Sequence, residues 1–160
     1  MAKYNLTLAL VRDQQQILLI NRLKQPFLGM WNGVGGKIES GETPIQGIKR
    51  EIQEETGLTM DHYELSQNGL LKWHQNGTFV DGIYLFVANL KQPFPQNVYP
   101  QATREGILNP FPTAWVTNKN NVGIVADLKA ALPSLLANEQ TTYYTNFVND
   151  ELTDFYPLPA

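Results

Sequence analysis

Hydrophobic residues in the first part of the chain follow patterns that are typical of β-strands. Residues 4–11 alternate partly between apolar and polar side chains, and residues 16–21 contain the aliphatic run Ile-Leu-Leu-Ile. A run this short suits a buried strand better than a helix. The polar residues 13–15 between the two segments predict a hairpin turn. Residues 22–30 then predict a loop, and short strands are expected on either side of the glycine-rich turn that follows.

Residues 44–56 form the clearest predicted helix. Thr43 is a suitable N-cap, Pro44 suits the first helical position, and Gln46 completes a capping box. Gly57 is well placed to end the helix, because glycine readily adopts a left-handed conformation. At about 100° per residue, the isoleucines of this segment form one apolar stripe, made of Ile45, Ile48 and Ile52.

The middle of the chain predicts a second hairpin and a long loop. Residues 63–74 and 78–90 are expected to form two strands, because Asn76-Gly77 between them is a strong hairpin signal. Residues 91–112 contain five prolines. They predict a loop of about twenty residues, and loops of that length are usually functional or disordered.

Three further elements are expected toward the C-terminus. Residues 114–116 predict a short strand, and residues 122–132 predict a helix whose end is disturbed by Pro133. Residues 141–148 and 152–156 have the β-rich pattern of a final hairpin.

The composition indicates one globular domain spanning residues 1–160. Strands alternate with helices, no repeat or linker divides the chain, and 42% of the residues are hydrophobic, so we expect an α/β fold with one core. The net charge of −3 offers no basic surface for a nucleic-acid polymer, and the absence of Cys excludes disulfides and thiol catalysis. Without a recognisable signal peptide or a membrane-length apolar run, we expect a cytoplasmic protein that binds no membrane, with a monomer slightly favoured.

One face of the predicted helix is acidic. Glu51, Glu54 and Glu55 lie on a strip beside the isoleucines, where like charges repel by about 0.2–0.5 kcal/mol per pair. A cation would reverse that sign, and Mg²⁺ prefers carboxylates together with substrate phosphates. The alternative is a solvated acidic surface, but Glu55 lies about 20° from Ile48 on the helical wheel, and a carboxylate beside a core stripe needs a partner. Arg50 is the obvious protein partner and is expected to orient these ligands.

The stretch GKIESGETPIQGIKREIQEETGL, residues 36–58, resembles the Nudix box. That motif begins with a glycine, five variable residues and a glutamate. Seven variable residues follow, and the motif then ends with the sequence Arg-Glu-apolar-any-Glu-Glu-any-Gly-apolar. Its nine fixed positions are all filled here, by Gly36, Glu42, Arg50, Glu51, Ile52, Glu54, Glu55, Gly57 and Leu58. A match of this length is far more specific than a short glycine motif.

The resemblance implies the Nudix α/β/α sandwich, with a mixed β-sheet between helices, and a hydrolase of nucleoside diphosphates linked to another group. It also implies Mg²⁺, with Mn²⁺ as a substitute, held by Glu51, Glu54, Glu55 and the carbonyl of Gly35. A nucleoside triphosphate would then give a monophosphate and pyrophosphate. Glu105 lies in the proline-rich segment, from which the family often supplies another glutamate as a metal ligand or as the base that activates water; a surface glutamate is the alternative.

Two features resemble the MutT-type branch, the 8-oxo-dGTP diphosphatases that remove oxidised purine nucleoside triphosphates. One is Trp31-Asn32-Gly33 just before the box. The other is an aromatic C-terminal hairpin, which helps to form the base pocket in mammalian-type members and here contains Tyr143, Tyr144, Phe147, Phe155 and Tyr156. The resemblance implies that Asn32 reads the base, since an amide offers a donor and an acceptor to a purine edge. The alternative for Asn32 is a turn residue.

Other candidate substrate contacts are less specific. Trp31 either supports the pocket or belongs to the core. Phe27, one position out of register with the family's pocket phenylalanine, is a candidate for stacking on the base. Arg22 is a candidate phosphate contact, and Lys37 is a further candidate contact to the substrate. The acidic pair that reads the oxidised base in mammalian-type members has no counterpart in the matching region 118–121, which contains asparagines and a lysine.

Three alternative functions stay open from the sequence. One is a Nudix pyrophosphatase acting on a dinucleoside polyphosphate, ADP-ribose or a nucleotide sugar, because the box binds only metal and diphosphate. Another is a non-catalytic nucleotide-binding regulatory module on the same fold, although such modules commonly lose box glutamates that this chain keeps. The third is a structural or interaction protein without a ligand.

Overall fold

The computed structural model describes residues 2–159, so positions 1 and 160 of the predicted domain lie outside the described residues. Its strands are β1 (Leu6–Arg12), β2 (Gln16–Arg22), β3 (Trp31–Asn32), β4 (Val34–Lys37), β5 (Tyr63–Gln75), β6 (Thr78–Leu90), β7 (Gln101–Ala102), β8 (Gly106–Pro112), β9 (Thr141–Val148) and β10 (Glu151–Pro157). Its helices are α1 (Pro44–Thr56), the short 3-10 helix η1 (Met60–His62), α2 (Thr113–Thr117) and α3 (Ala126–Leu136).

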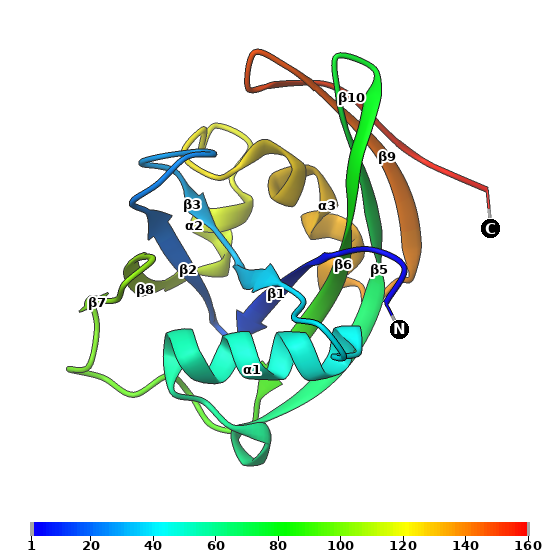
Figure 1. Ribbon diagram of the computed structural model, residues 1–160. Helices are drawn as coiled ribbons and strands as arrows, with labels where there is room; N and C mark the ends of the chain where they lie inside the picture. Colours follow the sequence, from blue (N-terminus) through cyan, green and yellow to red (C-terminus); the bar gives the residue numbers. More distant parts are fainter. Residues whose placement is uncertain (1, 160) are drawn as a thin grey trace.

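All of these strands belong to one sheet, in the order β10-β9-β5-β6-β1-β2-β8-β7, with β3 paired to β2 and β4 paired to β1. The sheet is mixed, because β1 pairs with β6, and β5 with β9, in parallel, while the other pairs are antiparallel. Figure 1 shows α1 on one face of the sheet and α2 and α3 on the other.

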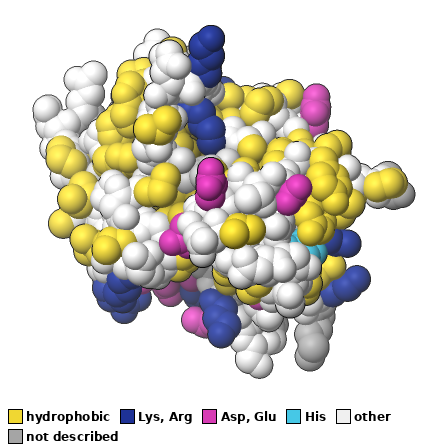
Figure 2. Space-filling model, turned by 90° about the horizontal axis from the view of Figure 1, so that it is seen from above, with side chains coloured by type: hydrophobic (Ala, Val, Ile, Leu, Met, Phe, Trp, Pro, Cys, Tyr) yellow, Lys and Arg dark blue, Asp and Glu magenta, His cyan; other side chains and the backbone are white. Residues whose placement is uncertain are grey.

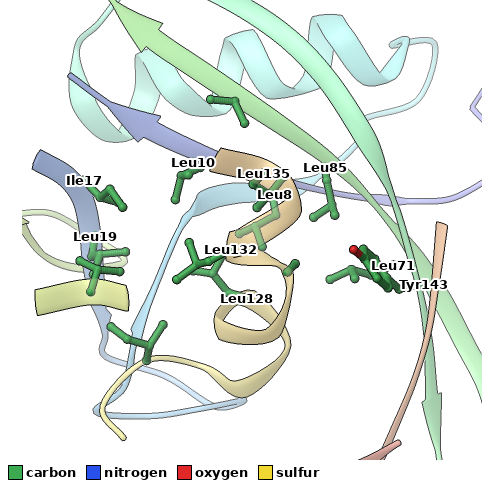
Figure 3. Packing of buried hydrophobic residues seen from close by; sticks show 14 residues of the cluster. Leu8, Leu10, Ile17, Leu19, Leu71, Leu85, Leu128, Leu132, Leu135 and Tyr143 are labelled. Carbon is green, nitrogen blue, oxygen red and sulfur yellow. The ribbon is translucent and has the colours of Figure 1, made fainter. Parts of the chain in front are cut away.

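Strand β1 separates two hydrophobic layers. Leu8 and Leu10 face the layer that contains α3, whereas Ala9 and Val11 face the layer that contains α1. Alternation between two apolar faces is expected of a strand that is covered on both sides. Figure 3 shows leucines of α3 packed beside strand side chains from β1, β2 and β6 in the first layer. The predicted α/β/α sandwich with a mixed sheet is therefore confirmed.

Helix α1 has the predicted boundaries and caps. The Thr43 side chain accepts the N–H of Gln46 at 3.1 Å, and the Gln46 side chain accepts the N–H of Thr43 at 2.9 Å. Gly57 ends the helix with a φ of 76°. The apolar stripe is narrower than predicted, because Ile48 and Ile52 are buried while Ile45 is 42% exposed. The helix thus buries one edge and leaves its acidic strip accessible.

The predicted hairpins are also present. Strands β1 and β2 pair across residues 13–15, β5 and β6 across Asn76-Gly77, and β9 and β10 across residues 149–150. Asn76 has a φ of 51° and Gly77 a φ of 80°. Positive φ at both turn residues matches the twist of the flanking strands, which explains why the Asn-Gly signal was reliable.

The prediction of one long loop over residues 91–112 is wrong. Its second half forms β7 and β8, and β8 pairs with β2 from Gly106 to Pro112. Pro110 and Pro112 lie beyond the part of β8 that pairs with β7, so one side of the strand has no neighbouring strand there. A residue without an N–H is tolerated on such an edge.

Two further boundaries differ from the predictions. Residues 114–116 lie in helix α2 rather than in a strand. The second long helix begins at Ala126 rather than at residue 122, because Ile124 is extended and forms a bridge with Trp31. It continues past Pro133 to Leu136. Within residues 2–159, none of the helices has the length and apolar character that crossing a membrane requires.

Candidate active site

One cavity joins the acidic strip of α1 to the segment before β8. It has a volume of about 350 Å³ and is lined by Glu51, Glu54, Glu55, Thr103, Arg104 and Glu105. Glu105 is far from the helix in sequence, but the pairing of β8 with β2 brings it to the three helix carboxylates. This opening, called the carboxylate cavity below, therefore holds four acidic side chains.

Burial and mutual repulsion disfavour the ionised forms of Glu51 and Glu55. The pKa of Glu55 is raised to about 7, first by burial and then by the charges of Glu51 and Glu105, while Arg22 opposes the rise. Burial also raises the pKa of Glu51, against the lowering effect of Arg50. Two neighbouring carboxylates with raised pKa values are typical of a site that receives a cation or carries out proton chemistry.

Arg50 of α1 binds one glutamate in the turn before the helix and two glutamates of the helix itself. Its Nε and Nη2 donate to the two carboxylate oxygens of Glu42 at 2.8 and 2.9 Å. Its Nη1 donates to Glu51 at 3.0 Å and to Glu54 at 3.4 Å. The paired guanidinium holds the pKa of Glu42 below its usual range. Glu42 is thus fully engaged with Arg50, whereas Glu51 and Glu54 each use a single oxygen in this contact.

The donor set fits a hard divalent cation. Carboxylate oxygens are the ligands that Mg²⁺ prefers, and Glu51, Glu54 and Glu55 supply them from one helix. Across residues 2–159, no three acidic, imidazole or thiolate side chains already surround a common point. Arg50 binds one oxygen of Glu51 and one of Glu54, which leaves the other oxygen of each carboxylate for a cation.

Gly36 allows the Glu51 carboxylate to lie against the backbone that precedes α1. A Cβ at position 36 would lie 2.5 Å from Glu51 Oε1 and 2.7 Å from its Cδ. Such distances are too short for any side chain, so the position requires glycine for this arrangement. Gly35, the preceding residue, lines a different cavity and would collide with the Thr7 carbonyl if it had a Cβ.

That second cavity, called the aromatic cavity below, has a volume of about 340 Å³. Its aromatic side chains are those of Phe27, Trp73 and Phe147, and its polar ones include Arg22, Asn32 and Asp127. The rings of Phe27 and Phe147 are 5.6 Å apart, so the loop before β3 meets the C-terminal hairpin at this cavity. Phe27 has a φ of 64°, which is unusual for a bulky residue and fixes its ring at that place.

Asn32 and Asp127 provide complementary polar groups in the aromatic cavity. The Asn32 Oδ1 accepts the N–H of Gly33 at 2.9 Å, which orients its amide. Asp127 is 6% exposed, and its carboxylate accepts the N–H of Leu128 at 2.9 Å. Burial raises the pKa of Asp127 to about 6. The cavity therefore offers an amide beside an acid that changes protonation near neutral pH.

Comparison with known proteins identifies the family. A model described as the NUDIX domain matches residues 4–116. The chain belongs to the Nudix family.

A curated relative, the oxidized purine nucleoside triphosphate hydrolase of Mus musculus, is 47% identical over 55 residues, which cover 34% of this chain and 35% of that protein. The 8-oxo-dGTP diphosphatase of Escherichia coli (strain K12) is 38% identical over 68 residues, which cover 41% of this chain and 52% of that protein. The matched segments thus span less than two thirds of these relatives.

A solved structure extends the similarity over nearly the whole chain. The mutator MutT protein from Bacillus halodurans has a TM-score of 0.74 and 25% sequence identity, over 97% of each chain. An Ap4A hydrolase from Caenorhabditis elegans, with a TM-score of 0.59 and 17% identity over 82% of this chain and 95% of that one, shares the fold.

The two cavities account for most of the residues expected from the Nudix box and its surroundings. Trp31 and Lys37 line neither of them. Trp31 instead packs against the core and lies 4.7 Å from Phe111 in an edge-to-face pair, so its core alternative applies. Lys37 is exposed at the end of β4, where its carbonyl accepts from Arg50 at 3.0 Å.

Asp127 is the acidic residue of the two cavities that the sequence did not single out. Residues 118–121, the region matched to the family's acidic pair, lie beside Trp115 at a separate cavity, which is lined by the three asparagines of this region. The predicted helix began at residue 122, which placed Asp127 in the interior of a helix. An acidic residue at such a position gives no signal of a functional site. The available signal was a single acid within the apolar sequence Ile-Val-Ala-Asp-Leu at 124–128.

Proposed function

We propose that the protein is a divalent-metal-dependent Nudix hydrolase that cleaves a nucleoside triphosphate into a monophosphate and pyrophosphate, with an oxidised purine as the preferred base. The position of Arg22 carries this proposal. Arg22 lines the aromatic cavity and also lowers the pKa of Glu55 in the carboxylate cavity. A nucleotide with its base in the first cavity and its phosphates at the second would pass Arg22, whose guanidinium suits phosphate oxygens.

The reaction at phosphorus depends on charge neutralisation and positioning. Mg²⁺ held by Glu51, Glu54 and Glu55 would neutralise phosphate charge and lower the pKa of a bound water. Arg50 holds the carboxylates of Glu51 and Glu54 in position through its Nη1. Either a box glutamate or Glu105 accepts the proton of the attacking water. Because the charge of Glu51 raises the pKa of Glu55, these two carboxylates titrate jointly rather than one by one.

Recognition of the base is assigned to Asn32 and Asp127, with the contacting rings of Phe27 and Phe147 beside it. An 8-oxopurine has an N7–H donor where the normal purine has an acceptor. An ionised Asp127 would accept from that N–H and would repel the lone pair of the normal base. Two of the relatives carry names that specify oxidised purine nucleotides, which supports this choice of base.

The proposed partner is a single nucleotide rather than a nucleic-acid polymer. The chain has a net charge of −3, which gives no electrostatic attraction to a polyanion. Figure 2 shows that the face seen from above carries mostly hydrophobic and uncharged side chains, with Lys and Arg mainly near its margins. Hydrolysis would then remove oxidised nucleotides from the free pool.

The test is a pyrophosphate- and phosphate-release assay of the purified protein with Mg²⁺. Its panel contains normal and oxidised purine and pyrimidine triphosphates, a dinucleoside polyphosphate and ADP-ribose. Preferential release of pyrophosphate from an oxidised purine triphosphate is expected. Activity centred on ADP-ribose or the dinucleotide would keep the phosphorus chemistry and reject the base assignment. Inactivity on the whole panel would contradict the proposed reaction.

A further inference from the structure

Lys129 on α3 binds three backbone carbonyls, one at the end of α2 and two in the loop between α2 and α3. Its Nζ donates to the carbonyl of Val116 at 2.7 Å, of Asn118 at 2.6 Å and of Asn121 at 3.2 Å. An ammonium group has three donors, so all of them are used by these carbonyls. Without the ammonium, three carbonyl dipoles would converge on an empty point, which is unfavourable when they are partly buried.

The segment after this loop is attached to the backbone of Trp31. The N–H of Trp31 donates to the carbonyl of Gly123 at 2.9 Å, and the N–H of Val125 donates to the carbonyl of Trp31 at 2.9 Å. Ile124 forms the bridge between these two bonds. Trp31 directly precedes Asn32, so the loop clamped by Lys129 leads into the segment that holds one polar residue of the aromatic cavity.

A second polar residue of the cavity, Asp127, lies on the helix of Lys129 itself. Asp127 is two positions before Lys129, and residues 123–125 connect the clamped loop to that helix. We propose that Lys129 is a positioning residue for the aromatic cavity, which fixes residues 123–125 against Trp31 and thereby sets Asn32 and Asp127 at the separation that the base requires. The role in base selection rests on the proposed function.

A purely structural lysine would behave differently. It would change the stability of the protein but leave the ratio of the two substrates unchanged. A positioning residue changes that ratio, because small displacements of binding groups cost about tenfold or more in rate. The phosphate chemistry lies in the carboxylate cavity, which Lys129 does not line.

The experiment compares Lys129→Met with Lys129→Arg and with the matched control Lys119→Met. Lys119 is an exposed lysine of the same loop. The activity readout is the ratio of kcat/KM for 8-oxo-dGTP to that for dGTP. The independent readout is hydrogen exchange of the Trp31 and Val125 amides, which donate the two bonds described above.

Lys129→Met is expected to lower the substrate ratio by about tenfold and to speed exchange at both amides. Lys119→Met should match the wild type, and Lys129→Arg should recover part of the ratio because it keeps the charge and donors. If Lys129→Met does not fold, Lys129→Gln replaces it in the same comparison. An unchanged ratio and unchanged exchange in a folded variant would overturn the positioning role.

Failure of the proposed function gives a different result. In that case the wild type shows no preference for the oxidised purine. Lys129 is then judged by amide exchange and by KM for whichever nucleotide the wild type hydrolyses. Faster exchange with a raised KM would support its positioning role, and no change in either would overturn it.

Discussion

Arg50 and Glu42 form a two-point ion pair, in which Nε and Nη2 of the arginine donate to the two oxygens of the carboxylate at 2.8 and 2.9 Å. Both side chains are about four fifths buried, with exposures of 21% and 18%. The pair joins the turn before α1 to the middle of that helix. This ion pair explains why Glu42, a glutamate of the Nudix box that lies outside the carboxylate cavity, is still needed for the geometry of the site.

Arg50→Lys is expected to weaken this attachment. A lysine cannot make the two parallel hydrogen bonds, so the free energy of unfolding should fall by about 1–2 kcal/mol, and turnover should fall as Glu51 and Glu54 lose their common donor. Urea denaturation and steady-state kinetics measure the two effects. Lys49→Arg on the same helix is the matched control. Wild-type values for Arg50→Lys in both measurements would contradict the role of the pair.

Glu54→Gln should reduce turnover at saturating Mg²⁺ by at least about a hundredfold, because it removes a charged ligand without changing side-chain volume. The melting temperature without metal should stay near that of the wild type, while the rise caused by added Mg²⁺ should shrink. Glu64→Gln, at an exposed position of β5, serves as the control. Turnover close to that of the wild type would remove Glu54 from the metal site.

Gly36→Ala tests the close approach between Gly36 and the Glu51 carboxylate. The added Cβ would lie 2.5 Å from Glu51 Oε1, so the carboxylate must move away. Because the displaced atoms are at the end of a flexible side chain, stability should change by less than about 1 kcal/mol while turnover falls. Normal kinetics of the Gly36→Ala variant would show that turnover does not depend on the position of the Glu51 carboxylate.

Asn32→Ala should abolish selectivity between oxidised and normal purine triphosphates and leave Mg²⁺ binding unchanged. The reason is that Asn32 lies in the aromatic cavity and lines no part of the carboxylate cavity. Competition kinetics with the two substrates, together with Mg²⁺ titration, separates the two properties. Asn89→Ala, at an exposed position of β6, is the control. Retained selectivity would return Asn32 to a turn role.

Asp127→Asn should make the protein more stable above pH 6. Burial raises the pKa of Asp127 from its usual 3.8 to about 6, so the folded state binds this proton more tightly than the unfolded chain does. The cost of ionisation is absent below about pH 4, grows between about pH 4 and 6, and is complete above that range.

The change in pKa corresponds to about 3 kcal/mol, which Asn would recover while keeping an acceptor for the Leu128 N–H. Urea denaturation of both proteins at intervals from pH 4 to 8 measures the difference. The same variant should lose preference for the oxidised purine. A stability difference that is equal at every pH would mean that Asp127 is not held in an unfavourable ionised state.

The parts of the fold that were predicted correctly depend on local signals. Helix α1 was bounded by Thr43, Pro44 and Gly57, each of which acts on its immediate neighbours. Strand β8 was missed because its strand character comes from pairing with β2, some ninety residues away in sequence, and the prolines at 110 and 112 pointed to a loop. Local propensity cannot report a partner of that kind.

The candidate site divides in the same way. The glutamates of α1 and their neighbour Arg50 were found because one helix contains them all. Asp127 was missed because it enters the aromatic cavity through the packing of α3. The two interpretations of Trp31 could not be separated, because its place beside Phe111 depends on residues brought together by the sheet. Proximity across elements was the missing information in both cases.

The C-terminal part of the chain, which follows the segment matched by the family model, has an evolutionary consequence. Phe147 of β9 and Asp127 of α3 both lie outside residues 4–116, the part of the chain that matches the family model. The carboxylate cavity, by contrast, is built entirely from residues within that range. Sequence drift after residue 116 can therefore reshape part of the aromatic cavity without changing any residue that lines the carboxylate cavity, so that the two cavities are free to diverge at different rates.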